Sequence, residues 1–388
     1  MKNIQYLSFI LAFALTVAAC NTINPPAKKT AEAAVEATSS GEEDYLSKIQ
    51  LPEGFQIEVY AEGIVNARSM CLSLSGTLYV GTRGEGSVYA LKDTDGDYKI
   101  DQQFTLAEGL TMPNGVAFKD GDLYVAEYNR VLKFKDIENN LETPKYDVIN
   151  DEYPSKKHHG WKYIAFGPDG KLYVPVGAPC NICESKDEIF NTITRINTDG
   201  SGMEIVARGV RNTVGFTWHP ETKELWFTDN GRDWMGDDLP ACELNRATAD
   251  DQHFGYPYCH QGDLIDPKLG AGKSCEDYIA PVQNLGAHVA ALGCEFYTGN
   301  QFPEEYTGQI FIAEHGSWNR SKKSGYRVTK VTLEDGKATS YQPFATGWLD
   351  TAADEAWGRP VDIELLPDGS MLVSDDFADM IYRISYKG

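Results

Sequence analysis

Residues Lys156–Val176 read KKHHGWKYIAFGPDGKLYVPV. Two lysines and two histidines precede an apolar run, a Pro-Asp-Gly turn and a second apolar run. A Pro-Asp-Gly turn between two β-rich runs predicts a β-hairpin. Histidine is the side chain best suited to move a proton near neutral pH, so a titratable cluster lies directly ahead of this hairpin.

The pattern of this hairpin recurs along the chain as an apolar run, a turn and a strand rich in aliphatic and aromatic residues. Six copies occur, at Ser73–Val80, Phe118–Val125, Phe166–Val174, Trp218–Phe227, Glu305–Ile312 and Leu366–Val373. Most begin about 45 to 60 residues apart, which is typical of one four-stranded blade per repeat. The repeat predicts an all-β chain folded as a six-bladed β-propeller.

Two further features concern the spacing and the ends of this repeat. The longest gap between copies holds Asp237–Gly286, an insertion rich in Asp, Gly, Pro and Cys. The β-rich runs Phe55–Tyr60 and Ile381–Tyr386 lie outside the first and last copies. We expect them to share one blade, because a blade built from both ends closes the ring and removes exposed strand edges.

The N-terminal region carries a targeting pattern. Residues 1–19 contain a charged start, a short apolar core and small residues before Cys20, as in a signal peptide. Val-Ala-Ala-Cys resembles the bacterial lipoprotein box, which implies export and a lipid anchor at Cys20 on the periplasmic or cell-surface side of the envelope. A plain secretory signal with an accidental cysteine is the alternative. Residues 20–48 read as a flexible tether and residues 49–388 as the propeller.

Charge and cysteine usage narrow the possible partners. The formal net charge of −22 argues against nucleic acid as a partner, and against membrane contact other than through the lipidated N-terminus.

Of eight cysteines, seven remain beyond Cys20, so at least one thiol is free or pairs outside the chain. Cys180 and Cys183 are interpreted as a local disulfide rather than a redox loop or half a metal site. Cys259 and Cys275 are the second candidate pair.

Polar and cationic residues precede the expected inner strand of every blade. They are Arg68, Asn114, His158, His159, Arg211, Asn212, His288 and Arg359. Around one axis, such residues predict a pocket with a positive lining that suits a ligand with carboxylates or phosphates. The stretch Asp229–Asp238 is acidic and contains turn-forming glycines, so it is either a site for a cation with oxygen ligands or an acidic surface loop.

A second acidic stretch, Asp93–Asp101, has Asp at alternate positions, as calcium loops do. Phe104 stands at the twelfth position, where such loops carry Glu. We interpret this stretch as a solvated hairpin tip, with a structural calcium site as the alternative.

Taken together, several motifs resemble the glucose/sorbosone dehydrogenase family. The motifs are His158–Lys162, Phe166–Gly170, Arg208–Asn212, Asp229–Gly231 and Gly358–Arg359, within a likeness that extends from Leu51 to Tyr386. Members of that family are propeller quinoproteins that use pyrroloquinoline quinone (PQQ) and calcium. The likeness is greatest to the L-sorbosone and pyranose dehydrogenases among them.

The resemblance implies roles for individual residues. The family's catalytic base falls on His159, with His158 as the reserve, although Lys162–Ile164 depart from the usual motif. The side chains assigned to the cofactor are Arg68, Arg211, Asn212 and Arg359. Where the family has a second arginine this chain has Val361, so we expect His315 or Arg320 to supply that cation. The backbone carbonyls of Gly231 and Arg232 are assigned to calcium.

The implied activity is oxidation of a sugar, or of a sugar-derived aldehyde or alcohol, by hydride transfer to the quinone. The chain has no haem motif, so electrons would pass to a separate acceptor. Trp161, Trp234 and Trp318 are candidates for stacking under a sugar ring, or they are packed within blades. The alternatives are a metal-dependent lactonase, which would need several carboxylates in the channel, and a binding propeller without a cofactor.

Overall fold

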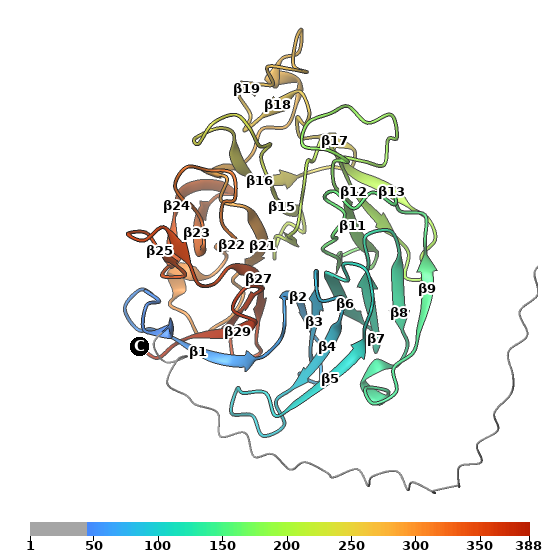
Figure 1. The fold of residues 1–388 in the computed structure, drawn as a ribbon, viewed down its shortest axis with the longest axis vertical. Helices are drawn as coiled ribbons and strands as arrows, with labels where there is room; N and C mark the ends of the chain where they lie inside the picture. The colour runs from blue at the N-terminus through green and yellow to red at the C-terminus, as the bar shows by residue number, and fades with distance from the viewer. Residues whose placement is uncertain (1–44) are drawn as a thin grey trace, which may run out of the picture. The chain divides into compact units, whose positions relative to one another are not determined.

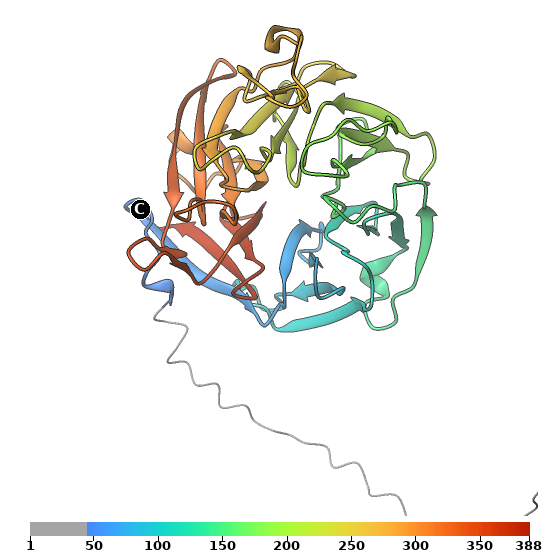
Figure 2. The ribbon, with the colours of Figure 1, turned by 45° about the horizontal axis from the view of Figure 1, so that its top comes forward.

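Six antiparallel sheets surround a common axis in the computed structural model, which describes residues 45–388 (Figures 1 and 2). The predicted all-β, six-bladed propeller is confirmed. The signal peptide and residues 20–44 of the tether lie outside the described residues. Among residues 45–388, no helix is long and apolar enough to cross a membrane.

Within each blade, the first strand faces the axis and the later strands follow toward the rim. Blade one contains β2 (Ala67–Leu72), β3 (Leu78–Thr82), β4 (Val88–Lys92) and β5 (Gln102–Ala107). Blade two contains β6 (Gly115–Lys119), β7 (Asp122–Ala126), β8 (Val131–Phe134) and β9 (Tyr146–Asn150). Blade three contains β10 (Ala165–Phe166), β11 (Leu172–Val176), β12 (Thr192–Ile196) and β13 (Glu204–Arg208).

The second half of the ring repeats this order. Blade four contains β14 (Phe216–Trp218), β15 (Leu225–Asp229), β16 (Ala241–Ala247) and β20 (Gln283–Ala287). Blade five contains β21 (Ala291–Phe296), β22 (Ile310–Glu314), β23 (Arg327–Glu334) and β24 (Lys337–Ala345). Blade six contains β27 (Pro360–Leu365), β28 (Met371–Asp375), β29 (Met380–Tyr386) and β1 (Phe55–Glu62). A short hairpin, β25 (Leu349–Asp350) with β26 (Glu355–Ala356), and the 3₁₀ helices η1 (Ile137–Asn139) and η3 (Glu304–Tyr306) lie between strands.

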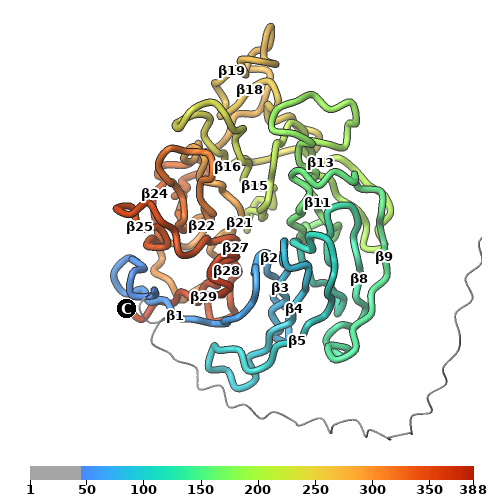
Figure 3. The backbone as a smooth tube through the Cα atoms, in the orientation of Figure 1, coloured from blue at the N-terminus to red at the C-terminus, as the bar shows by residue number. Residues whose placement is uncertain are grey.

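The ring closes as predicted, because the N-terminal strand β1 pairs with the C-terminal strand β29 (Figure 3). Their antiparallel register sets Phe55 opposite Tyr386. The chain ahead of β1 also lies on the propeller, since the ring of Tyr45 is 5.1 Å from that of Trp357. Residues 45–48, which the sequence pattern assigns to the tether, therefore contact the folded domain.

The insertion is shorter than the predicted Asp237–Gly286. Its two ends form β16 and β20, which pair with each other in blade four. Residues 248–282 remain outside the blade and contain β17 (Gln252–His253), β18 (Cys259–His260), β19 (Leu264–Ile265) and η2 (Cys275–Asp277). β18 and β19 form a hairpin at the top of Figure 1, and β17 pairs in parallel with β13 of blade three.

The structure confirms both predicted disulfides, Cys180–Cys183 and Cys259–Cys275. Within residues 45–388, the free cysteines are Cys71, Cys242 and Cys294. Burial raises the pKa of all three thiols, so they behave as apolar packing residues.

Neighbouring blades pack through apolar side chains between the blades and through glycines at the axis. Tyr79 of β3 stacks on Phe118 of β6 in the next blade, with ring centroids 5.6 Å apart. At the axis, a Cβ atom on Gly115 would lie 2.5 Å from the Lys162 carbonyl oxygen, and one on Gly293 would lie 2.6 Å from Asp362 Cα. These distances leave no room for any side chain, so glycine permits the inner strands to approach this closely.

Replacing Gly293 with Ala should destabilise the propeller. The added Cβ meets the main chain of β27, which cannot move without shifting a blade, and overpacking of this kind costs roughly 1–3 kcal/mol. Gly84→Ala is the matched control, because its nearest neighbour would be Asn66 Oδ1 at 3.5 Å. Denaturant unfolding should show a lower midpoint for G293A alone. Equal midpoints for the two variants would contradict the close approach.

Candidate active site

A cavity of about 360 Å³ lies at the end of the propeller where the inner strands begin and the second strands end. These two positions coincide because consecutive strands of a blade are antiparallel. The volume lies within the ~300–1,000 Å³ usual for small-molecule sites. The lining residues are Arg68, Arg83, His159, Trp161, Arg211, Asn212, Asn230, Gly231, Asp233, Cys242, His288, Ala290, Leu292, His315, Gly316, Ser317, Trp318, Tyr326 and Arg359.

The lining is cationic, although the whole chain is strongly acidic. Four arginines reach the cavity, and Asp233 is the one carboxylate among the described residues that line it. Buried guanidinium groups recognise carboxylates and phosphates in bidentate geometry. The cavity is therefore suited to an anionic ligand.

Ten of the residues singled out in the sequence meet in this cavity. They are Arg68, His159, Trp161, Arg211, Asn212, Gly231, His288, His315, Trp318 and Arg359. The residues assigned to calcium and to the cofactor thus lie in the same cavity as His159, the predicted base.

Five other predicted residues do not line the cavity, namely Asn114, His158, Arg232, Trp234 and Arg320. Arg320 donates from Nε to the Asp237 carbonyl oxygen at 3.0 Å and lies in a separate outer cleft beside Trp318. The side chain of Arg232 is buried in an ion pair with Asp266, at 2.6 Å. His158 is exposed, with its ring centroid 4.1 Å from that of His159.

Asp376, which the sequence analysis did not identify, joins three of the cavity's basic side chains. Its Oδ2 lies 2.6 Å from Arg68 Nη1, and its Oδ1 accepts a 2.9 Å hydrogen bond from His315 Nε2. Arg359 Nε lies 3.0 Å from the same Oδ1 but without hydrogen-bond alignment. Burial opposes ionisation of Asp376, but His315, Arg68 and Arg359 outweigh it and lower the pKa of that carboxyl far below its usual range.

Arg83 is a second residue that the sequence analysis missed. Its guanidinium lies over the ring of Trp161, with 3.8 Å between Cζ and the ring centroid. Within the described part of the chain, this guanidinium makes no hydrogen bond or ion pair. Burial and the neighbouring charges of Arg68 and Arg359 lower the pKa of Arg83 to about 10. Arg83 is thus a fixed cation whose donors are available to a ligand.

The position of Arg83 also bears on Val361, which stands where the resembled family has a second arginine. Val361 is buried in a small apolar cluster with Val214 and Leu292, against which Trp161 packs. A charged arginine side chain would be unfavourable in that apolar cluster. The additional cation in the cavity is Arg83, rather than the predicted Arg320, while His315 is engaged with Asp376.

His159 is held in one orientation by its own turn. Its backbone is left-handed, with φ at 48°, and Gly177 after β11 leaves room for it, since a Cβ there would lie 2.6 Å from His159 Cβ. His159 Nδ1 is 3.0 Å from the Ala178 carbonyl oxygen, which can only accept, so Nδ1 carries the proton. Burial, Arg211 and His158 lower the pKa of His159 well below 6.5. At neutral pH, Nε2 is therefore an unprotonated acceptor.

The carboxylate of Asp229 fixes the main chain of Arg211 and Asn212. Asp229 at the end of β15 accepts the backbone N–H of Arg211 at 2.7 Å and that of Asn212 at 2.6 Å. Arg211 Nη1 donates to the Asn230 carbonyl oxygen at 3.0 Å. The loop before β14 is thereby joined to the end of β15.

A pair of buried carboxylates lies next to Gly231. Asp229 on β15 is opposite Glu243 on β16, and both line a small cavity that Gly231 shares with the main one. Burial raises the pKa of Asp229 to about 6, and burial together with the Asp229 charge raises that of Glu243 to about 8. Two carboxylates and the adjacent main-chain carbonyls form a donor set of the type that calcium prefers.

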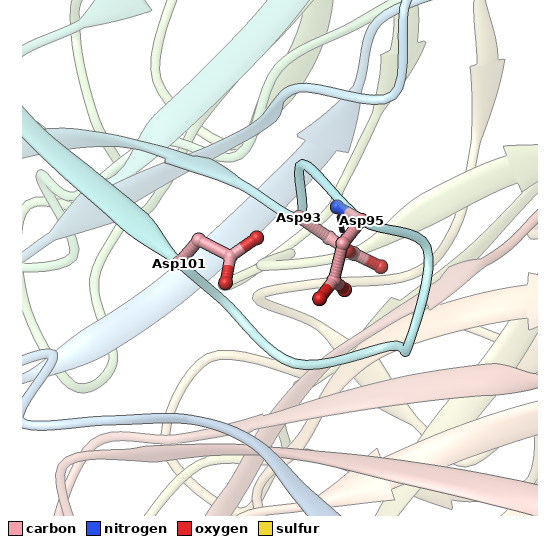
Figure 4. Close-up of side chains that lie close together, drawn as sticks. All are labelled: Asp93, Asp95 and Asp101. Carbon is pink, nitrogen blue, oxygen red and sulfur yellow. Dashed lines mark hydrogen bonds between the residues drawn. The ribbon is translucent and has the colours of Figure 1, made fainter.

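Asp93, Asp95 and Asp101 form a separate acidic cluster in the loop between β4 and β5 (Figure 4). Their nearest carboxylate oxygens lie within 4.8 Å of one another. Thr94 donates to Asp101 Oδ2, and Gly96 donates to Asp93 Oδ1, so the carboxylates also organise the turn itself.

Comparison with known proteins places the whole propeller in one family. Residues 41–383 match the sequence model of a family described as a domain of unknown function, DUF7133. The chain belongs to the DUF7133 family. An uncharacterized protein of Borreliella burgdorferi is 34% identical over 370 residues, covering 89% of this chain and 93% of that relative.

Solved structures at low sequence identity share the fold of this chain. A calcium structure of a Trichoderma reesei protein of the Carbohydrate-Active Enzymes family AA12 has a TM-score of 0.77 at 20% identity, covering 87% of this chain and 97% of that one. The PQQ domain of the Coprinopsis cinerea pyranose dehydrogenase, in its holo form, has a TM-score of 0.75 at 16% identity over the same shares. At these identities the likeness establishes the propeller and no more.

Substituting Asp376 with Asn should destabilise the protein strongly. The change leaves the buried guanidinium of Arg68 without its counter-charge, and removal of one partner from a buried pair costs about 3–5 kcal/mol. Asp147→Asn is the control, because the Asp147–Lys135 pair is exposed and should not affect unfolding. Thermal unfolding of the two variants tests this difference. A wild-type midpoint for D376N would show that Asp376 does not anchor the cluster.

Proposed function

We propose that this protein is a PQQ- and calcium-dependent dehydrogenase of sugars or of sugar-derived alcohols and aldehydes. The observation that carries the proposal is the placement of Arg83 and Arg359, both with donors available, in one cavity with the unprotonated Nε2 of His159. The names of the AA12 protein and of the pyranose dehydrogenase PQQ domain support the same class.

The residues present fit PQQ, which is a planar tricarboxylate. Arg359 Nε and Trp161 Nε1 are both buried without a hydrogen-bond partner, and the guanidinium of Arg83 is also available. Arg83 and Arg359 would hold the carboxylates, with Arg68, Arg211 and Asn212 beside them in the cavity lining. When bound, the quinone supplies the electrophilic carbonyl carbon that accepts hydride.

Calcium would be held next to Gly231. Its main-chain carbonyl and that of Arg232 are the proposed ligands, and a bound cation would favour the ionised forms of Asp229 and Glu243 beside them. The side chain of Arg232 is engaged with Asp266, so only its carbonyl is available for this role. The cation supplies Lewis-acid polarisation of the quinone.

His159 is the proposed catalytic base. The Ala178 carbonyl fixes the proton on Nδ1, and the lowered pKa keeps Nε2 unprotonated at neutral pH. Nε2 would accept the proton from the substrate hydroxyl as its carbon loses hydride. Trp318 lines the cavity and is 72% exposed, so its face is available to a sugar ring.

The arrangement of charges favours this activity over a lactonase. A metal-dependent lactonase would need several carboxylates in the cavity, whereas Asp233 is the only one lining it among the described residues. We further propose that the protein acts outside the cytoplasm, anchored by lipid at Cys20, and passes electrons to a separate carrier.

Titration with PQQ and Ca²⁺ tests the proposal directly. The protein should bind PQQ in the presence of Ca²⁺, followed by the absorbance of the quinone. The loaded protein should then reduce a dye with a member of a panel of sugars, polyols and aldehydes. Absence of PQQ binding would leave a binding propeller as the better description, and lactone hydrolysis without PQQ would favour the lactonase.

His159→Ala should lower kcat by about 10²–10⁴-fold, because a positioned general base contributes a factor of this size. PQQ affinity should stay within a few-fold of the wild type, since the arginines are unchanged. His158→Ala, in the exposed neighbouring ring, is the control and should retain activity. If H158A loses turnover and H159A does not, the roles of the two histidines are reversed.

A further inference from the structure

We propose that Asn181, in the loop closed by the Cys180–Cys183 disulfide, is a positioning residue for Arg211 and Asp233, and that reduction of this disulfide by a dithiol releases both. The effect on cofactor binding rests on the proposed function. The positioning itself does not, because it concerns contacts within the protein alone.

Asn181 makes four hydrogen bonds that bridge two sides of the cavity wall. Its carbonyl oxygen accepts Arg211 Nε at 3.0 Å, and its Oδ1 accepts Arg211 Nη2 at 2.8 Å. The same Oδ1 accepts the backbone N–H of Asp233 at 2.8 Å, and Asn181 Nδ2 donates to the Asp233 carbonyl oxygen at 3.1 Å. One side chain thus fixes a guanidinium from the loop before β14 and the main chain after β15.

Arg211 depends on these contacts because its side chain is only 4% exposed. Beyond Asn181, its guanidinium has the Asn230 carbonyl oxygen at 3.0 Å and Asp233 Oδ2 at 3.3 Å. Displacement of the whole Asn181 residue would leave two N–H groups of a buried cation without these acceptors, and loss of its side chain alone would leave one, which is costly. We therefore expect Arg211 to leave its present position when Asn181 is displaced.

The loop that carries Asn181 has little other support. Residues 179–186 form no hydrogen bond between main-chain groups. The hydroxyl of Tyr256, from the insertion, donates to the Asn181 carbonyl oxygen at 3.3 Å and accepts the Cys183 N–H at 3.2 Å. The disulfide is therefore the one covalent constraint that holds the Asn181 main chain against Arg211 and Tyr256.

The disulfide is also accessible to a reductant, because both of its cysteines are partly exposed. A dithiol thiolate attacks one sulfur, its second thiol completes the exchange, and the reagent leaves as a cyclic disulfide. Two electrons and two protons are transferred, and Cys180 and Cys183 become thiols. The four-residue loop then gains conformational freedom, which removes the fixed placement of Asn181.

The test compares wild type before and after dithiothreitol, Asn181→Ala, and the double variant C180S/C183S. Hydrogen exchange of the ligand-free protein reports on the Asp233 amide, which donates to Asn181 Oδ1. We expect at least tenfold faster exchange there for N181A, for C180S/C183S and for the reduced wild type. Ile182→Ala in the same loop is the matched control and should exchange like the oxidised wild type.

The second readout is the dissociation constant for PQQ with Ca²⁺. We expect it to rise at least tenfold in N181A and C180S/C183S, with thermal midpoints near that of the wild type. C180S/C183S retains Cys259–Cys275, so its PQQ affinity should not respond to dithiothreitol. A response there would assign the sensitivity to the other disulfide.

Unchanged exchange at Asp233 in both N181A and C180S/C183S would overturn the proposal. Faster exchange in N181A alone would retain the positioning role and overturn the role of the disulfide. If the oxidised wild type does not bind PQQ, the proposed function fails, and the exchange data still decide whether Asn181 and the disulfide position the main chain at Asp233.

Discussion

The close approach of the inner strands at the axis is the constraint on which the rest of the structure depends. At Gly115 and Gly293, the main chain of one blade lies where a side chain of its neighbour would be. A narrow ring brings the loops before the inner strands within side-chain reach of one another. Residues separated by hundreds of positions, such as Arg68 and Asp376, can then form a single ion pair. The packing of the backbone at the axis therefore determines where the cavity lies, and the side chains determine its lining.

A second consequence concerns charge. Burying several cations together is unfavourable unless anions lie among them, and Asp376 provides one such anion beneath the cavity. It satisfies Arg68 and His315 but leaves most donors of Arg359 unused, while Arg83 has only the face of Trp161. Some basic residues, such as Arg68, are therefore engaged in contacts that stabilise the fold. Others, such as Arg83 and Arg359, keep donors available in the cavity.

The sequence predicted the features that depend on local patterns and missed those that depend on folding. Turns such as Gly167–Gly170 identify hairpins, and hairpins repeated six times identify the ring. The ends of the insertion were assigned wrongly, because the Asp- and Gly-rich composition around Leu239 obscured β16. Arg83 and Asp376 were missed because they follow second strands, whereas the positive lining was predicted from residues before inner strands. Because consecutive strands of a blade are antiparallel, the residues after a second strand lie at the same end of the blade as those before the inner strand. The sequence pattern could therefore have identified Arg83 and Asp376. The partner of Arg232 could not be found in this way, since Asp266 lies in an irregular loop.

The pairing of β1 with β29 has a consequence for biosynthesis. β1 is among the first strands to leave the ribosome, and its partner is the last. Blades one to five can form in order as the chain emerges, but blade six needs both ends of the chain. Asp376 and Arg359 belong to that last blade, so the ionic cluster is assembled only after β28 and β29 have emerged. A chain without these strands could form most of the scaffold but not the Asp376 cluster, so this part of the cavity forms together with the closure of the ring.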